Sequence, residues 1–223
     1  TYGSDNIAIG PAMPRENVFK AITACMDIVG ELAQQGVKLI VTGEMGIGNT
    51  TPTAALSSVI LGLPPETVTG RGAGLSSEML QHKVDVVRRA IAVNSPLSDD
   101  PAELISKLGS YEIAGMTGLF LGGAFYGVTM VIDGVISAVS AVLAAMFNEA
   151  CTDYMLAGHV SAEPAGKGLL EKLGLRAVIN GGLRLGEGTG GILLLPLLDG
   201  AAALYYNSHK FDDLDIERYV ELK

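Results

Sequence analysis

The chain has 223 residues, of which 48% are hydrophobic, and a formal net charge of −9. This length fits one large domain, and the apolar content excludes a disordered chain. Because an acidic surface repels nucleic-acid phosphates and anionic membranes, neither is expected as a partner, and any phosphate site must be built locally.

The sequence predicts helices that alternate with short buried strands. Amphipathic spacing with proline starts and glycine ends indicates helices, and short apolar runs are typical of buried strands. In chain order the predicted elements are helix Pro14–Gln35, strand Lys38–Thr42, helix Thr51–Leu61, strand Thr67–Thr69, helices Ser76–Asn94 and Pro101–Leu108, strand Val128–Ile132, helix Val135–Phe147, strand Tyr154–Ala157, helix Pro164–Leu173, strand Val178–Asn180 and a helix from Gly191 on through Leu204.

This alternation predicts an α/β fold, a Rossmann-like parallel sheet with helices on both faces. Residues 1–209 are expected to form this large domain. The charged segment 210–223 is expected to be a helical tail or part of a small domain. In such sheets ligands bind at the carboxyl ends of the strands, where the glycine-rich loops of this chain fall.

One uncharged segment, Ile113 to Ile132, is long enough to span a bilayer. Its glycines and the immediately following Asp133 favour a glycine-rich helix or turn that leads into a buried strand. The two cysteines, Cys25 and Cys151, lie far apart and fit a reducing cytosol, so a cytoplasmic location is expected.

The loop Gly43–Thr51 (GEMGIGNTT) lies between a predicted strand and a predicted helix. Glycines such as Gly46 and Gly48 let the backbone approach a ligand closely, and the helix start offers free N–H groups to a phosphate. The loop nearly fits the P-loop pattern, but Asn49 stands where that pattern needs lysine, which argues against a nucleoside triphosphatase. The alternative is a tight turn capped by Asn49 or Thr50.

A second glycine cluster, Gly181–Gly191, contains the carboxylate Glu187. Desolvation among glycines and apolar residues would raise the pKa of such a carboxylate, which suits a general base near neutral pH. The alternative is a solvated loop glutamate.

Further candidates stand near predicted strand ends or glycine turns: Gly72, Lys83, Asp133, His159 and Ser161. On spacing alone Lys83 could equally be a solvated helix residue, and Ser161 a helix N-cap. His82 and His159 have no partner at a metal-ligand spacing, so no metal and no other cofactor is expected.

Four strings of the sequence resemble the nicotinate-nucleotide–dimethylbenzimidazole phosphoribosyltransferase family in order and spacing over nearly the whole chain. They are GEMGIGNTT from Gly43, HKVDVVRRAI from His82, GHVSAEP from Gly158 and LRLGEGTGG from Leu183. The resemblance implies transfer of ribose 5-phosphate from nicotinate mononucleotide to 5,6-dimethylbenzimidazole or a similar base. The products are nicotinate and α-ribazole 5′-phosphate, for the lower ligand of cobalamin.

The resemblance also implies roles for individual residues. Glu187 corresponds to the general base, and Glu44 lies by the same site. The resemblance implies phosphate binding for the loop glycines Gly46, Gly48 and Gly188 with Gly72, Lys83 and Ser161. Asn49, Thr50, Asp133 and Leu185, in the same loops or near a predicted strand end, are also predicted to bind substrate or phosphate. The resemblance further implies a homodimer.

Members of this family carry a further N-terminal segment that contributes part of the benzimidazole pocket. The chain is therefore expected to bind nicotinate mononucleotide and to be weak or inactive as an enzyme alone. The alternative function is a phosphate- or nucleotide-binding module without catalysis of its own.

Overall fold

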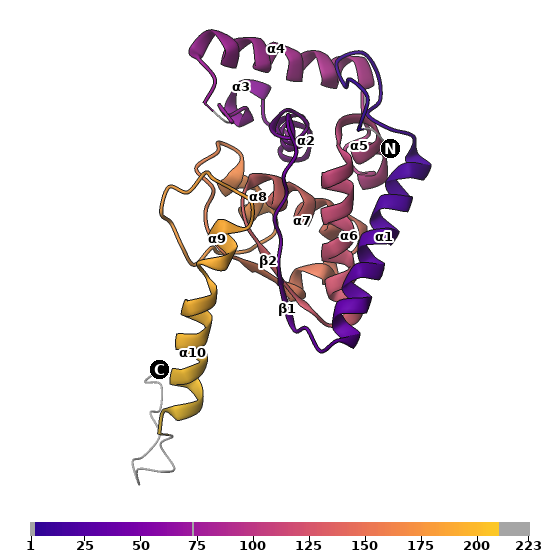
Figure 1. Cartoon of the computed structure of the whole chain (residues 1–223). Coiled ribbons are helices and arrows are strands. Elements are labelled where there is room, and N and C mark those ends of the chain that lie inside the picture. Colours follow the sequence, from indigo (N-terminus) through magenta and orange to yellow (C-terminus); the bar gives the residue numbers. More distant parts are fainter. Residues whose placement is uncertain (1–2, 73, 210–223) are drawn as a thin grey trace, which may run out of the picture.

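The computed structural model describes residues 3–72 and 74–209 of the chain (Figure 1). Helices surround a small sheet, and an extended C-terminal helix leaves the body. The elements are α1 (Arg15–Gln34), β1 (Leu39–Val41), α2 (Thr50–Leu61), α3 (Pro65–Val68), α4 (Ser77–Asn94), α5 (Pro101–Leu108), α6 (Tyr111–Tyr126), β2 (Thr129–Ile132), α7 (Val135–Phe147), the 3-10 helix η1 (Glu149–Tyr154), β3 (Met155–Ala157), α8 (Gly166–Lys172), α9 (Thr189–Ile192) and α10 (Leu195–Asn207).

The sheet has three parallel strands in the order β1-β2-β3. Ile40 pairs with Met130, and Val131 pairs with Leu156. The predicted α/β fold, with a parallel sheet flanked by helices, is confirmed. Because all three strands run in one direction, their carboxyl ends meet at one edge, and that edge carries the cavity described below.

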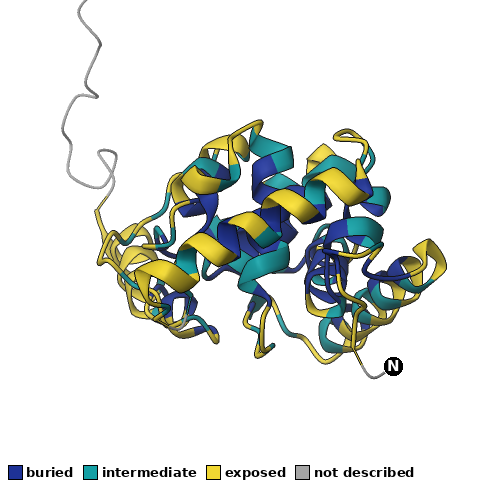
Figure 2. Cartoon of the chain, turned by 90° about the horizontal axis from the view of Figure 1, so that it is seen from above, coloured by how far each residue is buried: buried dark blue, intermediate teal, exposed yellow. Residues whose placement is uncertain are grey.

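Side-chain caps help to set where several helices begin. Ser76, Asp100 and Ser110 each accept a hydrogen bond from a backbone N–H in the first turn of α4, α5 and α6. Such caps satisfy backbone donors that have no partner within the helix. Seen from above, the surface helices turn exposed residues outward and buried residues toward the core (Figure 2).

The uncharged segment Ile113–Ile132 forms the buried helix α6 and strand β2, as the sequence predicts. Its glycines let α6 pack closely on α1. A Cβ on Gly118 would overlap the carbonyl oxygen of Ile22, and one on Gly122 would lie 3.0 Å from the Cβ of Val29. The helix is therefore apolar because it lies in the interior of the domain.

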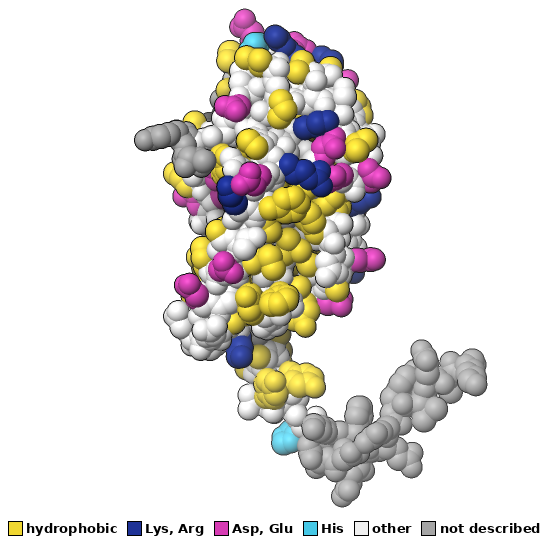
Figure 3. Space-filling model, turned by 90° about the vertical axis from the view of Figure 1, so that its right-hand side faces the viewer, with side chains coloured by type: hydrophobic (Ala, Val, Ile, Leu, Met, Phe, Trp, Pro, Cys, Tyr) yellow, Lys and Arg dark blue, Asp and Glu magenta, His cyan; other side chains and the backbone are white. Residues whose placement is uncertain are grey.

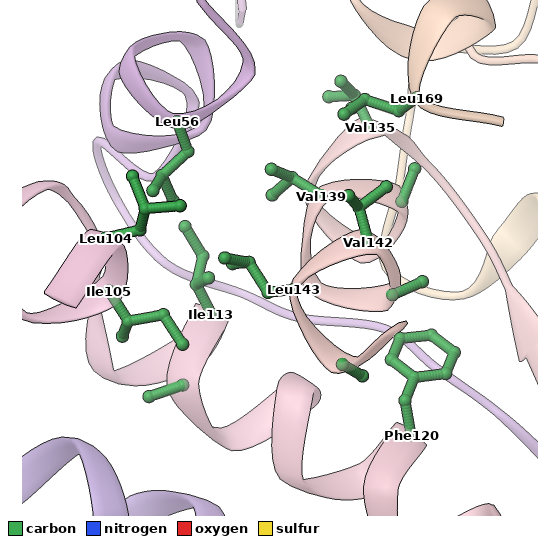
Figure 4. Close-up of a cluster of buried hydrophobic side chains, with 14 of the residues drawn as sticks. Leu56, Leu104, Ile105, Ile113, Phe120, Val135, Val139, Val142, Leu143 and Leu169 are labelled. Carbon is green, nitrogen blue, oxygen red and sulfur yellow. The ribbon is translucent and has the colours of Figure 1, made fainter. Parts of the chain in front are cut away.

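A cluster of large aliphatic side chains joins the helices of the upper half to those against the sheet. Leu56 of α2, Leu104 of α5 and Leu143 of α7 are fully buried and point toward one another (Figure 4). Burial of each side chain of this size stabilises the folded protein by about 1.5–3 kcal/mol. This core fixes α2, whose first turn forms part of the site.

Two predicted strands are not found as strands. Thr67 and Val68 lie in the helical turn α3, because Pro65 stands at its first position, where the fixed proline geometry favours a helix. Of Val178–Asn180, only Ile179 forms an isolated bridge, with His159. The sheet of the described residues is therefore smaller than the five strands predicted.

Helix α10 forms the predicted C-terminal helix after a break near Leu194, and none of its residues is buried. By length and composition alone, Thr189–Asn207 is apolar enough to cross a membrane, a test that core helices and signal sequences also pass. The predicted tail at 210–223 lies outside the described residues.

Hydrophobic side chains gather at the centre of the face that carries α1, with charged residues around them (Figure 3). The exposed large apolar residues of α1 and α6 are Phe19, Ile28, Phe125 and Tyr126.

Candidate active site

A cavity of about 370 Å³ lies at the carboxyl edge of the sheet. Both glycine-rich loops line it, together with the segments that follow β2 and β3. Its walls include Glu44, Gly46, Thr50, Gly72, Asp133, Ser161, Leu185 and Glu187. The structure thus brings together eight of the twelve site residues predicted from the sequence, and the other four stand directly behind or beside them.

The first loop runs from β1 into α2 and turns at Gly48, whose φ of +91° favours glycine. Asn49 is buried and does not cap α2. Its side-chain amide instead donates a hydrogen bond of 2.5 Å to Glu44 Oε2. A Cβ on Gly46 would overlap this amide. The loop therefore holds the Glu44 carboxylate in a defined place at the cavity wall.

Burial raises the pKa of Glu44 above its ordinary value, and the negative charges of Glu112 and Glu187 add to this. The hydrogen bond from Asn49 acts in the opposite direction. Glu112, at the start of α6, carries no sequence signal that marks it for this site. It lines a neighbouring cavity of about 380 Å³ with Gly48 and Asn49.

A buried cation stands beside the first turn of α2. Lys83 of α4 is 7% exposed, and its Nζ donates to Thr50 Oγ1 at 2.8 Å and to the carbonyl oxygen of Gly70 at 3.0 Å. Gly72 adopts a φ of +53° next to this ammonium group. Lys83 is thus not the solvated helix residue that its spacing also permitted. Burial lowers the pKa of Lys83, and the negative charge of Glu163 opposes the change.

Ser161 is buried after β3 and does not cap α8, which begins after Ala165. Its Oγ accepts the N–H of Glu163 at 3.3 Å, so the hydroxyl proton can still donate to a ligand. Glu163 lines the cavity and lies in the string GHVSAEP, but nothing in the spacing of the sequence marks it as a site residue.

The second loop places Glu187 in the left-handed region of backbone space, with a φ of +57°. Non-glycine residues rarely adopt this conformation, and residues held there gather at functional sites. The predicted desolvation of Glu187 is wrong for this chain, because its side chain is exposed and Leu185 is 72% exposed. The surrounding glycines have no side chains with which to cover it.

Asp133 and His159 lie beneath this loop. The Asp133 carboxylate accepts the backbone N–H of Gly188 at 3.1 Å and that of Gly191 at 2.9 Å. His159 is 2% exposed, with Nδ1 3.8 Å from Asp133 Oδ1, and burial lowers its pKa although Asp133 opposes this. His82 is exposed on α4. Among the described residues, no three His, Cys, Asp or Glu side chains group as a metal site.

Comparisons with known proteins agree with this arrangement. The profile of a family described as phosphoribosyltransferase matches residues 1–216. Nicotinate-nucleotide–dimethylbenzimidazole phosphoribosyltransferase of Clostridium acetobutylicum is 41% identical over 221 residues, which are 99% of this chain and 63% of the relative. The enzyme of the same name from Acetivibrio thermocellus is 43% identical over 97% of this chain and 62% of its own length.

A solved structure shows the same likeness. The crystal structure of CobT from Thermus thermophilus superimposes with a TM-score of 0.89 at 37% identity and covers 97% of this chain and 64% of its own. The chain therefore spans a little under two thirds of the length of these relatives.

Proposed function

The chain belongs to the phosphoribosyltransferase family, and we propose that it transfers ribose 5-phosphate from nicotinate mononucleotide to 5,6-dimethylbenzimidazole or a related base. The products are nicotinate and α-ribazole 5′-phosphate, for the lower ligand of cobalamin. One observation carries the proposal: two carboxylates, Glu44 and Glu187, line one cavity with glycine turns, and the buried ammonium group of Lys83 contacts its wall at Thr50.

The phosphate would dock at the start of α2, beside the place where Lys83 contacts Thr50. Thr50, Gly72 and Ser161 face the same cavity and offer hydroxyl and backbone donors. The positive end of the α2 dipole also points to this place, although the N–H of Thr51 donates to the carbonyl of Gly48 and Pro52 has no N–H. In a chain with a net charge of −9, such a local group of donors is what an anion needs.

The reaction exchanges one C–N bond for another at the anomeric carbon of the ribose. The bond to the pyridinium nitrogen breaks, nicotinate takes the electron pair, and a benzimidazole nitrogen forms the new bond. The other benzimidazole nitrogen gives up its proton, which Glu187 accepts as general base. Glu44 stabilises the positive charge that develops on the sugar. General-base catalysis contributes about 10²–10⁴-fold in rate.

The alternative is a module that binds the nucleotide without catalysis of its own. It is favoured by the open side of the cavity, where Met45 is 79% exposed and Leu185 is 72% exposed. An aromatic base placed there would meet few packed side chains from the described residues. This alternative predicts nucleotide binding without product.

The substitution Glu187→Gln separates the two functions. If the chain is the transferase, ribazole phosphate formation, followed by mass spectrometry, should fall about 10²–10⁴-fold while nicotinate mononucleotide binds with unchanged affinity. The matched control is Glu31→Gln on the exposed side of α1. Unchanged turnover in Glu187→Gln would remove Glu187 as the base, and wild-type binding without product would favour the binding module.

We further infer a cytoplasmic homodimer without nucleic-acid or membrane partners. The acidic net charge supports the absence of anionic partners. The exposed apolar residues of α1 and α6 offer a surface that a second copy could cover.

A further inference from the structure

Asp133 is the only buried carboxylate among the residues that the structure describes, with 3% of its surface exposed. It follows β2 directly and stands at the carboxyl edge of the sheet. Its backbone N–H donates to Ser137 Oγ at 3.2 Å, and Ser137 in turn contacts the Thr42 hydroxyl at 2.6 Å. The backbone of Asp133 is thus tied to the start of α7 and, through Ser137, to Thr42 directly after β1.

Both oxygens of Asp133 are engaged by the loop that carries Glu187. Oδ2 accepts the N–H of Gly188, the residue next to Glu187, and Oδ1 accepts the N–H of Gly191 at the end of that loop. Hydrogen bonds to an ionised carboxylate are about twice as strong as neutral ones. The loop is therefore attached to the sheet on the C-terminal side of Glu187.

Close backbone contacts fix the same loop from other sides. A Cβ on Gly43 would lie 2.8 Å from the nitrogen of Gly188, and one on Gly190 would overlap the ring of His159. Because Gly43 precedes Glu44, the contact between Gly43 and Gly188 also sets how the two carboxylates stand relative to each other. Glu187 needs such support, because its left-handed backbone is not one that glutamate adopts readily.

A direct role of Asp133 in holding the substrate phosphate is unfavourable on charge. Two anions repel, and each oxygen of this carboxylate already accepts a backbone donor. The phosphate donors named above come instead from Lys83, Thr50 and Gly72. Asp133 therefore has a role at this cavity other than phosphate binding.

We propose that Asp133 is a positioning residue that fixes Glu187 through the backbone N–H groups of Gly188 and Gly191. This inference rests on the proposed function, because Glu187 is the base only if the chain is the transferase. From the sequence, Asp133 is predicted to bind substrate or phosphate, and the contacts of its carboxylate assign it to the loop instead.

Amide hydrogen exchange of the intact protein tests the attachment without any need for activity. In the wild type, the N–H groups of Gly188 and Gly191 should be protected although Glu187 and Thr189 beside them are exposed. In Asp133→Asn, an NH₂ group replaces one acceptor oxygen, so at least one of the two N–H groups should exchange about tenfold faster or more. Rapid exchange in the wild type, or equal exchange in both proteins, would overturn the proposal.

Kinetics test the consequence for Glu187. Asp133→Asn should lower turnover with dimethylbenzimidazole by about 10²-fold, the effect of a displacement of about 1 Å. The dissociation constant of nicotinate mononucleotide should stay within about twofold of wild type. The double variant with Glu187→Gln should lose no more than Glu187→Gln alone, because both changes act on one group. Additive losses would overturn the proposal.

The control is Asp27→Asn, an exposed residue of α1 that should change neither exchange nor turnover. The two arms separate this inference from the proposed function. A wild type that forms no product contradicts the transferase, and the exchange arm still decides whether Asp133 holds the loop. A wild type that turns over, with loop exchange unaffected by Asp133→Asn, leaves the transferase intact and overturns the role of Asp133.

Discussion

The change of Lys83 to methionine removes the one buried ammonium group among the described residues and keeps nearly the same side-chain length. Of its three N–H donors, two go to Thr50 and to the carbonyl of Gly70, which leaves one for a phosphate oxygen. A hydrogen bond between charged groups contributes about 1.5–3 kcal/mol. The variant should therefore bind nicotinate mononucleotide about 10–150-fold more weakly.

Calorimetric titration with two ligands isolates the phosphate. Nicotinate riboside lacks the phosphate, so its affinity should change less than about twofold on Lys83→Met. The matched control is Lys20→Met on α1, whose Nζ forms an ion pair with the exposed Glu16. An equal loss for both ligands, or an unchanged affinity for the nucleotide, would refute the assignment of Lys83 to the phosphate.

The pH dependence gives a second measure of the same lysine. Burial lowers the pKa of Lys83 below its usual value. The folded protein therefore favours the neutral amine. At low pH the buried charge lowers the free energy of unfolding, and this loss disappears as pH rises toward the usual lysine pKa. A bound phosphate favours the charged amine. The affinity of the wild type for the nucleotide should thus fall as pH rises through the lowered pKa, and Lys83→Met should not show this fall.

Glu44→Gln should change how thermal stability depends on pH, because burial raises the pKa of Glu44. The stability linked to the protonated carboxyl is present below its usual pKa and lost as pH rises through the raised value. In a fluorimetry series the difference in Tm between variant and wild type should therefore shift in favour of the variant as pH rises above the usual glutamate pKa, and a constant difference would contradict this. Gly118→Ala should lower the free energy of unfolding in urea by about 1–3 kcal/mol, because its methyl group meets the carbonyl of Ile22. Gly200→Ala in α10, where a Cβ meets nothing within 4 Å, should raise it by up to about 1 kcal/mol. If both glycine variants change the free energy of unfolding in the same direction, the close approach of α1 and α6 is not what requires glycine at position 118.

Local signals in the sequence were sufficient for most of the helices. The apolar spacing of α1 and the Ser76 cap of α4 place those elements to within a residue or two. The strand predicted at Thr67–Thr69 was wrong because a pair of prolines outweighs a short β-branched run. Which strands join the sheet depends on long-range pairing that no local pattern contains.

The site shows the same division. The glycine loops and Glu187 could be found because strings of that kind are rare and resemble a known family. The burial of Lys83 could not be predicted, because its ammonium group packs against the start of α2, at Thr50, which no local pattern brings next to α4. The exposure of Glu187 also could not be predicted, because it depends on how the loop folds and on which described residues lie beside it. Whether these residues act as predicted stays a prediction.

The walls of the cavity come from segments that begin near Gly43 and end near Glu187, and the three parallel strands bring these segments together. No short fragment of the chain contains the whole site, so the site should assemble late in folding, after the long-range contacts have formed. A ligand of the cavity then binds only the assembled protein and shifts the folding equilibrium toward it. Screening small anions by their effect on melting would consequently report on ligand fit and on completeness of folding in one experiment.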